Sequence, residues 1–139
     1  MTVYGPSYDN TKEKQMTYQL GQRSLQNLSG VHPDLVAVVK RAIEITDQDF
    51  SVIEGIRNIN RQRELVKSGA SQTMNSRHLT GHAVDLAPYP LSWDWEYFYP
   101  IEEAMKLAAD ELEIDLEWGG DWKSFKDGPH WQLSRKTYP

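Results

Sequence analysis

The chain of 139 residues contains no cysteine, which excludes both a disulfide framework and a zinc site with cysteine ligands. It has no run of 18 apolar residues, so we expect no membrane-spanning helix. Its 15 Lys and Arg residues are scattered and its formal net charge is −5, which disfavours nucleic-acid binding because phosphates need clustered cations. Any metal must therefore be held by histidine and carboxylate side chains.

The length of the chain fits one compact domain. The first residues are polar and lack the apolar core of a signal peptide, so we expect synthesis in the cytoplasm. The organisation that follows is a polar N-terminal segment over residues 1–18 and a single domain over residues 19–139. We expect this domain to be a monomer.

Apolar spacing and turn residues predict the secondary structure. Helices are expected over 20–28, from Pro33 onward, over about 61–68 with Asn60 as its cap, and over 95–113. Strands are expected over 50–56, 83–87, 114–118 and 131–133. Because strands and helices do not alternate regularly, the pattern favours an α+β fold, a small domain with a mainly antiparallel sheet and flanking helices.

Three residues could together bind a metal. His78 lies in a turn, Asp85 lies on the strand that follows, and His130 begins another strand. A buried carboxylate needs a partner, and a metal ion is one such partner. Catalytic zinc typically has three protein ligands and an open fourth position. On these residues alone the alternative stays open that His78 is an exposed loop residue and Asp85 a paired core carboxylate.

Other polar residues near these stretches have two interpretations each. Asp127 is the candidate general base three positions before His130, or it only shapes the Asp-Gly turn. Arg57 at a strand end could stabilise a developing oxyanion, or it could lie on the surface. His82 stands four positions after His78, but Leu79 replaces the glutamate of the helical zincin motif. We therefore expect His82 to lie behind the ligands or on the surface.

The order and spacing of these residues resemble a known family. The motifs that carry the resemblance are Ser76-x-His78-x-x-Gly81-x-Ala83-x-Asp85, Asp127-x-x-His130 and Gly55-x-Arg57-x-x-x-Arg61-Gln62. They are similar to the D-Ala-D-Ala carboxypeptidases (VanY-like zinc metallopeptidases) and especially to the phage L-alanyl-D-glutamate peptidases. The similarity covers about residues 19–134.

The resemblance implies a fold shared with hedgehog domains and DD-peptidases. It also implies that His78, Asp85 and His130 are zinc ligands, that Asp127 is the base, and that Arg57 contacts substrate or stabilises the transition state. It further implies that Ser76 supports the site from behind the ligands. We also expect Gln62 and His82 to lie behind the ligands or against substrate.

The activity implied is that of a phage endolysin, which cleaves the L-Ala–D-Glu bond of peptidoglycan and lyses the host after release through a holin pore. A single domain with no wall-binding module fits a Gram-negative host. Two alternatives stay open. One is a D-Ala-D-Ala carboxypeptidase or dipeptidase, and the other is a non-catalytic, zinc-containing domain that binds the cell wall.

Overall fold

Four antiparallel strands form the centre of the structure, a computed structural model that describes residues 17–139. The strand order is β2-β3-β5-β4. The strands are β2 (Phe50–Glu54), β3 (Ala83–Pro88), β4 (Leu116–Trp118) and β5 (His130–Leu133). The α-helices are α1 (Gln22–Asn27), α2 (Pro33–Ile45), α3 (Ile59–Ser68) and α4 (Phe98–Leu112). The predicted α+β fold with an antiparallel sheet is confirmed.

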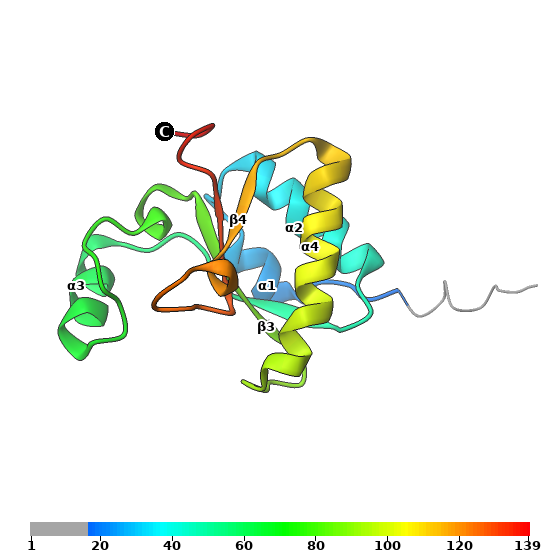
Figure 1. Cartoon of the computed structure of the whole chain (residues 1–139), viewed down its shortest axis with the longest axis horizontal. Helices are drawn as coiled ribbons and strands as arrows, with labels where there is room; N and C mark the ends of the chain where they lie inside the picture. The colour runs from blue at the N-terminus through cyan, green and yellow to red at the C-terminus, as the bar shows by residue number, and fades with distance from the viewer. Residues whose placement is uncertain (1–16) are drawn as a thin grey trace, which may run out of the picture.

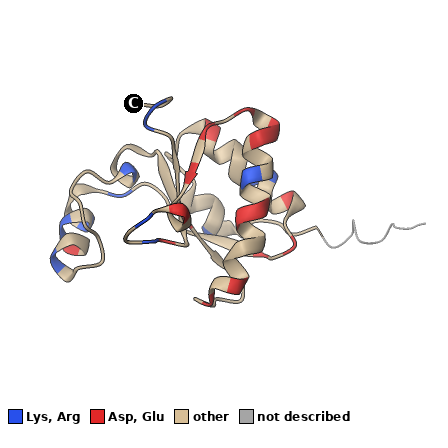
Figure 2. Cartoon of the chain, viewed as in Figure 1, with Lys and Arg blue, Asp and Glu red and all other residues tan. Residues whose placement is uncertain are grey.

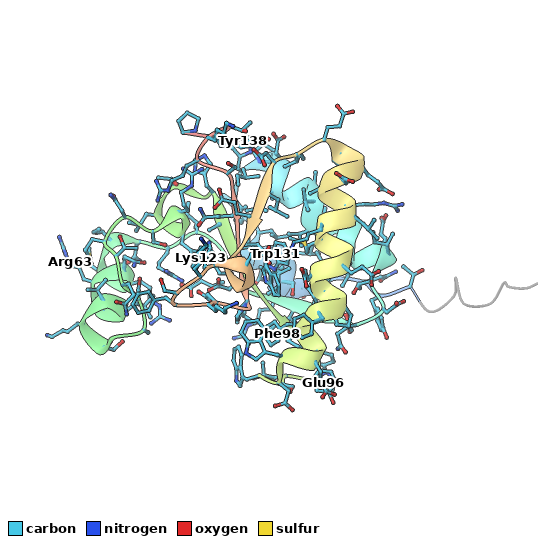
Figure 3. The ribbon with its side chains drawn as sticks, viewed as in Figure 1. Arg63, Glu96, Phe98, Lys123, Trp131 and Tyr138 are labelled. Carbon is cyan, nitrogen blue, oxygen red and sulfur yellow. The ribbon has the colours of Figure 1, made fainter. Side chains whose placement is uncertain are left out.

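The two faces of the sheet have different surroundings. Helices α1, α2 and α4 gather on one side, whereas α3 and the loops next to it extend from the other (Figure 1). Trp131, which is 1% exposed, points from β5 toward α4, and Phe98 lies below it (Figure 3). The apolar core therefore fills only one side of the sheet, and the side that carries α3 is left for polar side chains.

Local signals explain where the helices begin and end. Pro33 is the first residue of α2, and the His32 ring accepts a hydrogen bond of 3.0 Å from the main-chain N–H of Asp34. Helix α3 is capped by Asn58, whose side chain accepts from Arg61 N at 2.7 Å. The predicted cap at Asn60 was therefore wrong, because the chain already becomes helical at Ile59.

Element ends differ from the predicted ones by a few residues. Strand β2 ends at Glu54 rather than at residue 56, after an irregularity of register between Val52 and Glu54. Strand β5 begins at His130, directly before the predicted range 131–133 and as expected for His130 itself. The long helix begins at Phe98 and follows a short 3-10 helix over Trp95–Tyr97.

Of the predicted N-terminal segment over residues 1–18, residues 1–16 lie outside the described part of the chain. Within residues 17–139, no helix has the length and apolar character that crossing a bilayer would require.

Candidate metal centre

The register of the sheet places two of the three predicted ligands side by side. Asp85 on β3 is paired directly with His130 on β5, and on its other side Asp85 is paired with Glu54 on β2. Directly opposite residues of antiparallel strands point to the same face. Val84 and Leu86 alternate with Asp85, point to the other face and are fully buried in the core. Asp85 therefore faces away from its apolar neighbours.

The third residue, His78, reaches this face from a loop. A short 3-10 helix, Arg77–Thr80, follows Ser76, whose hydroxyl accepts from the main-chain N–H of His78 at 3.2 Å. The helix ends at Gly81, whose φ of 78° lies in the left-handed region that favours glycine. The imidazole of His78 is 2% exposed. Ser76 thus supports the turn that brings His78 to the sheet.

Each histidine is oriented by a hydrogen bond through one ring nitrogen. His78 Nδ1 lies 2.8 Å from the carbonyl oxygen of Gly55, which can only accept, so this nitrogen donates. His130 Nε2 lies 2.8 Å from Gln132 Oε1. The other nitrogens, His78 Nε2 and His130 Nδ1, lie 3.2 Å and 3.4 Å from Asp85 Oδ1. Partners of this kind behind metal-binding histidines fix the ring and its tautomer.

The spacing of these three atoms fits a divalent metal. His78, Asp85 and His130 each offer one ligand atom, and all three atoms lie within 4.8 Å of one another. Two ligands at zinc-like bond lengths of about 2.05 Å and at a tetrahedral angle are about 3.3 Å apart. The measured 3.2 Å and 3.4 Å match this spacing. The structure therefore brings together a group that can bind a metal ion.

The charge of Asp85 is stabilised where it lies. Burial acts against ionisation, but the hydrogen bonds with His130 and His78 outweigh it and lower the pKa of the Asp85 carboxyl well below its usual range. For His130, burial favours the neutral ring and is the largest single effect, but the hydrogen bond with Asp85 and the negative charge of Asp85, together with smaller contributions from Gln132 and Asp127, outweigh it and raise the pKa. The site thus presents an ionised carboxylate between two imidazoles.

Arg57 lies beside the His–Asp–His group, and its side chain is 7% exposed. Its Nε donates to Glu54 Oε2 at 2.8 Å, its Nη1 donates to Gln62 Oε1 at 2.8 Å, and its Nη2 lies 3.6 Å from Asp85 Oδ2. Its Nη1 is also 3.5 Å from Ser76 Oγ. The interpretation of Arg57 as a surface residue is therefore wrong.

Gln62 links Arg57 to the loop after α3. It is fully buried, and its Nε2 donates to Ser71 Oγ at 2.8 Å and to Thr73 O at 2.6 Å. Because its Oε1 accepts from Arg57, every polar atom of the amide has a partner. Gln62 therefore holds the guanidinium and the neighbouring loop in one arrangement.

Asp127 lies at the edge of the same cleft. Its main-chain N–H donates to Gly119 O at 3.0 Å, and its carbonyl accepts from His130 N at 3.2 Å. Partial burial, followed by the negative charge of Asp85, raises the pKa of the Asp127 carboxyl. A half-buried carboxylate next to a potential metal site has the properties of a proton acceptor.

His82 is not brought to the site. It is absent from the residues that line the cleft, its Nδ1 lies 2.7 Å from Thr80 Oγ1, and its ring is 5.5 Å from that of His32. His82 extends the strand of Asp85 and is separated from Asp85 by an odd number of positions, so its side chain faces the other way. Strand alternation is the signal that would have placed it.

Sequence reasoning missed three partners of the site. Gln132 supports His130 from two positions along β5, so the same alternation could have identified it. Glu54 binds Arg57 from the end of β2, and its spacing of three residues was the available signal. The carbonyl of Gly55 carries no side-chain signal of its own.

These side chains line a cleft of about 780 Å³ between the sheet, α3 and the loop over residues 122–127. Its wall includes Arg57, His78, Asp85, Asp127 and His130. The volume lies within the range of ligand-binding clefts, about 300–1,000 Å³. The group that could bind a metal therefore lies in the wall of a cleft large enough for a molecule of peptide size.

Known proteins share this architecture. The structure superposes on Serratia marcescens L-Ala D-Glu endopeptidase ChiX with a TM-score of 0.83 and 50% sequence identity, covering 89% of this chain and 96% of that chain. The fold of this chain, which carries the His–Asp–His group, is thus that of L-Ala D-Glu endopeptidases.

Sequence comparisons specify the family. The phage L-alanyl-D-glutamate peptidase family matches residues 16–138, and the chain belongs to it. The L-alanyl-D-glutamate peptidase of Escherichia phage T5 is 35% identical, over 88% of this chain and 94% of that protein. The protein of the same name from Listeria phage A118 is 34% identical over 88% of this chain, which spans 45% of that protein's length.

Proposed function

We propose that the protein is a zinc-dependent endopeptidase that hydrolyses the L-Ala–D-Glu bond of peptidoglycan stem peptides and acts as a phage endolysin. The observation that carries the proposal is the spacing of 3.2 Å and 3.4 Å among the ligand atoms at the wall of an open cleft. The names of the similar proteins supply the substrate. We also expect action on the wall of the host after release through a holin pore, as the family resemblance implies.

His78, Asp85 and His130 would hold the metal. Two nitrogens and one carboxylate oxygen are a donor set that suits zinc, and the chain has no cysteine to compete. When bound, zinc supplies a Lewis acid for the scissile carbonyl and lowers the pKa of water in its open position to about 7.

Asp127 would move the proton. Its carboxylate accepts the proton of the attacking water and passes it to the nitrogen of D-Glu, which leaves as a free amine. Burial and the charge of Asp85 raise the pKa of Asp127, which makes the carboxylate a better proton acceptor. The hydrolysis is balanced: the C–N bond breaks, oxygen bonds to the L-Ala carbonyl carbon, and the proton ends on the amine.

Arg57 would stabilise negative charge at the scissile carbonyl. Its contacts with Glu54, Gln62 and Asp85 fix the guanidinium at the cleft wall. One N–H of Nη2 is not needed for these contacts and can serve the developing oxyanion. A pure wall-binding domain would require neither this buried arginine nor Asp127.

Digestion of purified peptidoglycan tests the proposal. The zinc-loaded protein, the chelated protein and the chelated protein with zinc restored are compared, and the products are identified by mass spectrometry. New D-Glu amines that require the metal support the proposal. Release of free D-Ala instead would assign the carboxypeptidase reaction, and binding to the wall without any cleavage would assign a binding domain.

A further inference from the structure

Charge is distributed unevenly along the chain despite its acidic total. Residues 54–82 carry five Lys or Arg against two Asp or Glu, whereas residues 83–120 carry one Lys against ten Asp or Glu. In Figure 2 basic residues lie on α3 and on the loops beside the cleft, and acidic residues concentrate on α4 and β4. The molecule therefore presents a basic side at its cleft and an acidic side opposite.

Most of the cationic side chains that line the cleft already form an ion pair or hydrogen bonds within the protein. The lining contains four of them, Arg57, Arg77, Lys126 and Arg135. Arg57 is ion-paired with Glu54, and Arg77 and Arg135 donate to main-chain carbonyl oxygens. The ammonium group of Lys126 has no ion pair or hydrogen bond with another residue in the described part of the chain. Lys126 is therefore the cation available to an anion that enters.

The position of Lys126 indicates which anionic group of the substrate it could bind. Lys126 precedes Asp127, and both line the cleft. In the proposed reaction Asp127 gives a proton to the amine of D-Glu. The stem peptide continues through the γ-carboxyl of D-Glu, so its α-carboxylate is free and is carried by the same carbon as that amine. An anion on the substrate therefore lies within a few ångströms of the proton that Asp127 delivers.

We propose that Lys126 binds the α-carboxylate of D-Glu and makes the protein selective for stem peptides in which this group is not amidated. The inference rests on the proposed function and adds to it a determinant of substrate choice. A hydrogen bond between an ammonium group and a carboxylate is roughly twice as strong as a hydrogen bond between neutral groups. The amidated peptide cannot form it and would leave the ammonium group without an anionic partner.

Two synthetic peptides test this inference with the zinc-loaded protein. Both contain an acylated L-Ala–D-Glu unit extended through the γ-carboxyl, and they differ only in having a carboxylate or a carboxamide at the α-position. We expect the wild-type kcat/KM to be about tenfold higher for the carboxylate, as for a hydrogen bond between charged groups. Lys126→Gln should lose this preference by slowing cleavage of the carboxylate peptide alone, and Lys126→Arg should retain most of it.

Lys123 provides a matched control. It is an exposed lysine of the same loop but is not part of the cleft lining, so Lys123→Gln should keep the wild-type preference. Equal cleavage of both peptides by the wild type, or an unchanged preference in Lys126→Gln, would overturn the role of Lys126 and leave the proposed activity intact. If neither peptide is cut while peptidoglycan is also untouched, the proposed function fails together with the inference.

Discussion

Replacement of Asp127 by asparagine tests the proposed proton acceptor without disturbing the fold. The loop around Asp127 is held by main-chain hydrogen bonds to Gly119 and His130 at 3.0 Å and 3.2 Å, which the substitution leaves in place. Asparagine has nearly the same volume, so no cavity is created. Asp127 is not one of the three residues grouped as potential metal ligands. We therefore expect Asp127→Asn to bind one zinc per chain and to unfold at the wild-type temperature.

The expected loss of activity follows from the role assigned to the carboxylate. Positioned general acid–base groups contribute about 10²–10⁴-fold to rate. Asp127 would serve both as the acceptor and as the donor of the same proton, and its raised pKa brings it nearer to working pH. We therefore expect kcat to fall about 10³-fold, equivalent to about 4 kcal/mol of transition-state stabilisation, with little change in KM.

The assay combines cleavage of a synthetic stem peptide with elemental analysis of the same protein sample. Asp121→Asn is the control. Asp121 lies, like Asp127, between β4 and β5, but it forms an ion pair with Lys106 at 2.7 Å and does not line the cleft. It should retain full activity. An Asp127→Asn protein with stoichiometric zinc and kcat within about tenfold of wild type would refute the assignment.

Three further changes probe the metal, the turn and the arginine pair. His78→Ala should lose zinc and cleavage together, and a variant that still binds one zinc per chain by elemental analysis would remove His78 from the ligands. Gly81→Ala should lower the free energy of unfolding by about 2 kcal/mol in urea, because φ is 78° and a Cβ would lie 2.8 Å from Gly30 O; an unchanged value would contradict this. Burial raises the pKa of the Glu54 carboxyl and is the largest single effect, but the hydrogen bond and the charge of Arg57 oppose it, and the net pKa is lowered. The ion pair of Glu54 with Arg57 therefore stabilises the fold above the ordinary carboxyl pKa of about 4.3, and this stabilisation is lost as pH falls through the lowered pKa. Glu54→Gln should therefore flatten the fall in melting temperature between neutral and acidic pH, and an unchanged pH profile would exclude the pair as its source.

The sequence predicted the parts of the fold that depend on local chemistry. Pro33 begins α2 as expected, and Gly69 ends α3 with a φ of 84°. The choice between Asn58 and Asn60 as a cap could not be made from residue type, since both are good caps. Only the extended backbone of Asn58, at φ −88° and ψ 167°, decides it.

The sequence likewise predicted only part of the candidate site. Side chains with a distinctive spacing, such as His78 and Asp85, were found in advance, and the structure brings them together. The partners that orient the histidines were not found, because one is a main-chain carbonyl and the other, Gln132, is an ordinary polar residue of a strand. Such partners are defined by the register between strands and by loop packing, which the sequence states only indirectly.

The segment that carries Arg57 also has a role through its main chain. His78 Nδ1 donates to Gly55 O at 2.8 Å, and Arg57 N donates to His78 O at 2.9 Å. A Cβ on Gly55 would lie 1.8 Å from Asn27 O, so the close approach that exposes this carbonyl requires glycine. The two hydrogen bonds fix the imidazole of His78 and the main chain at Arg57 relative to each other. A change at Gly55 would therefore displace the segments that carry both His78 and Arg57, although glycine itself has no side chain.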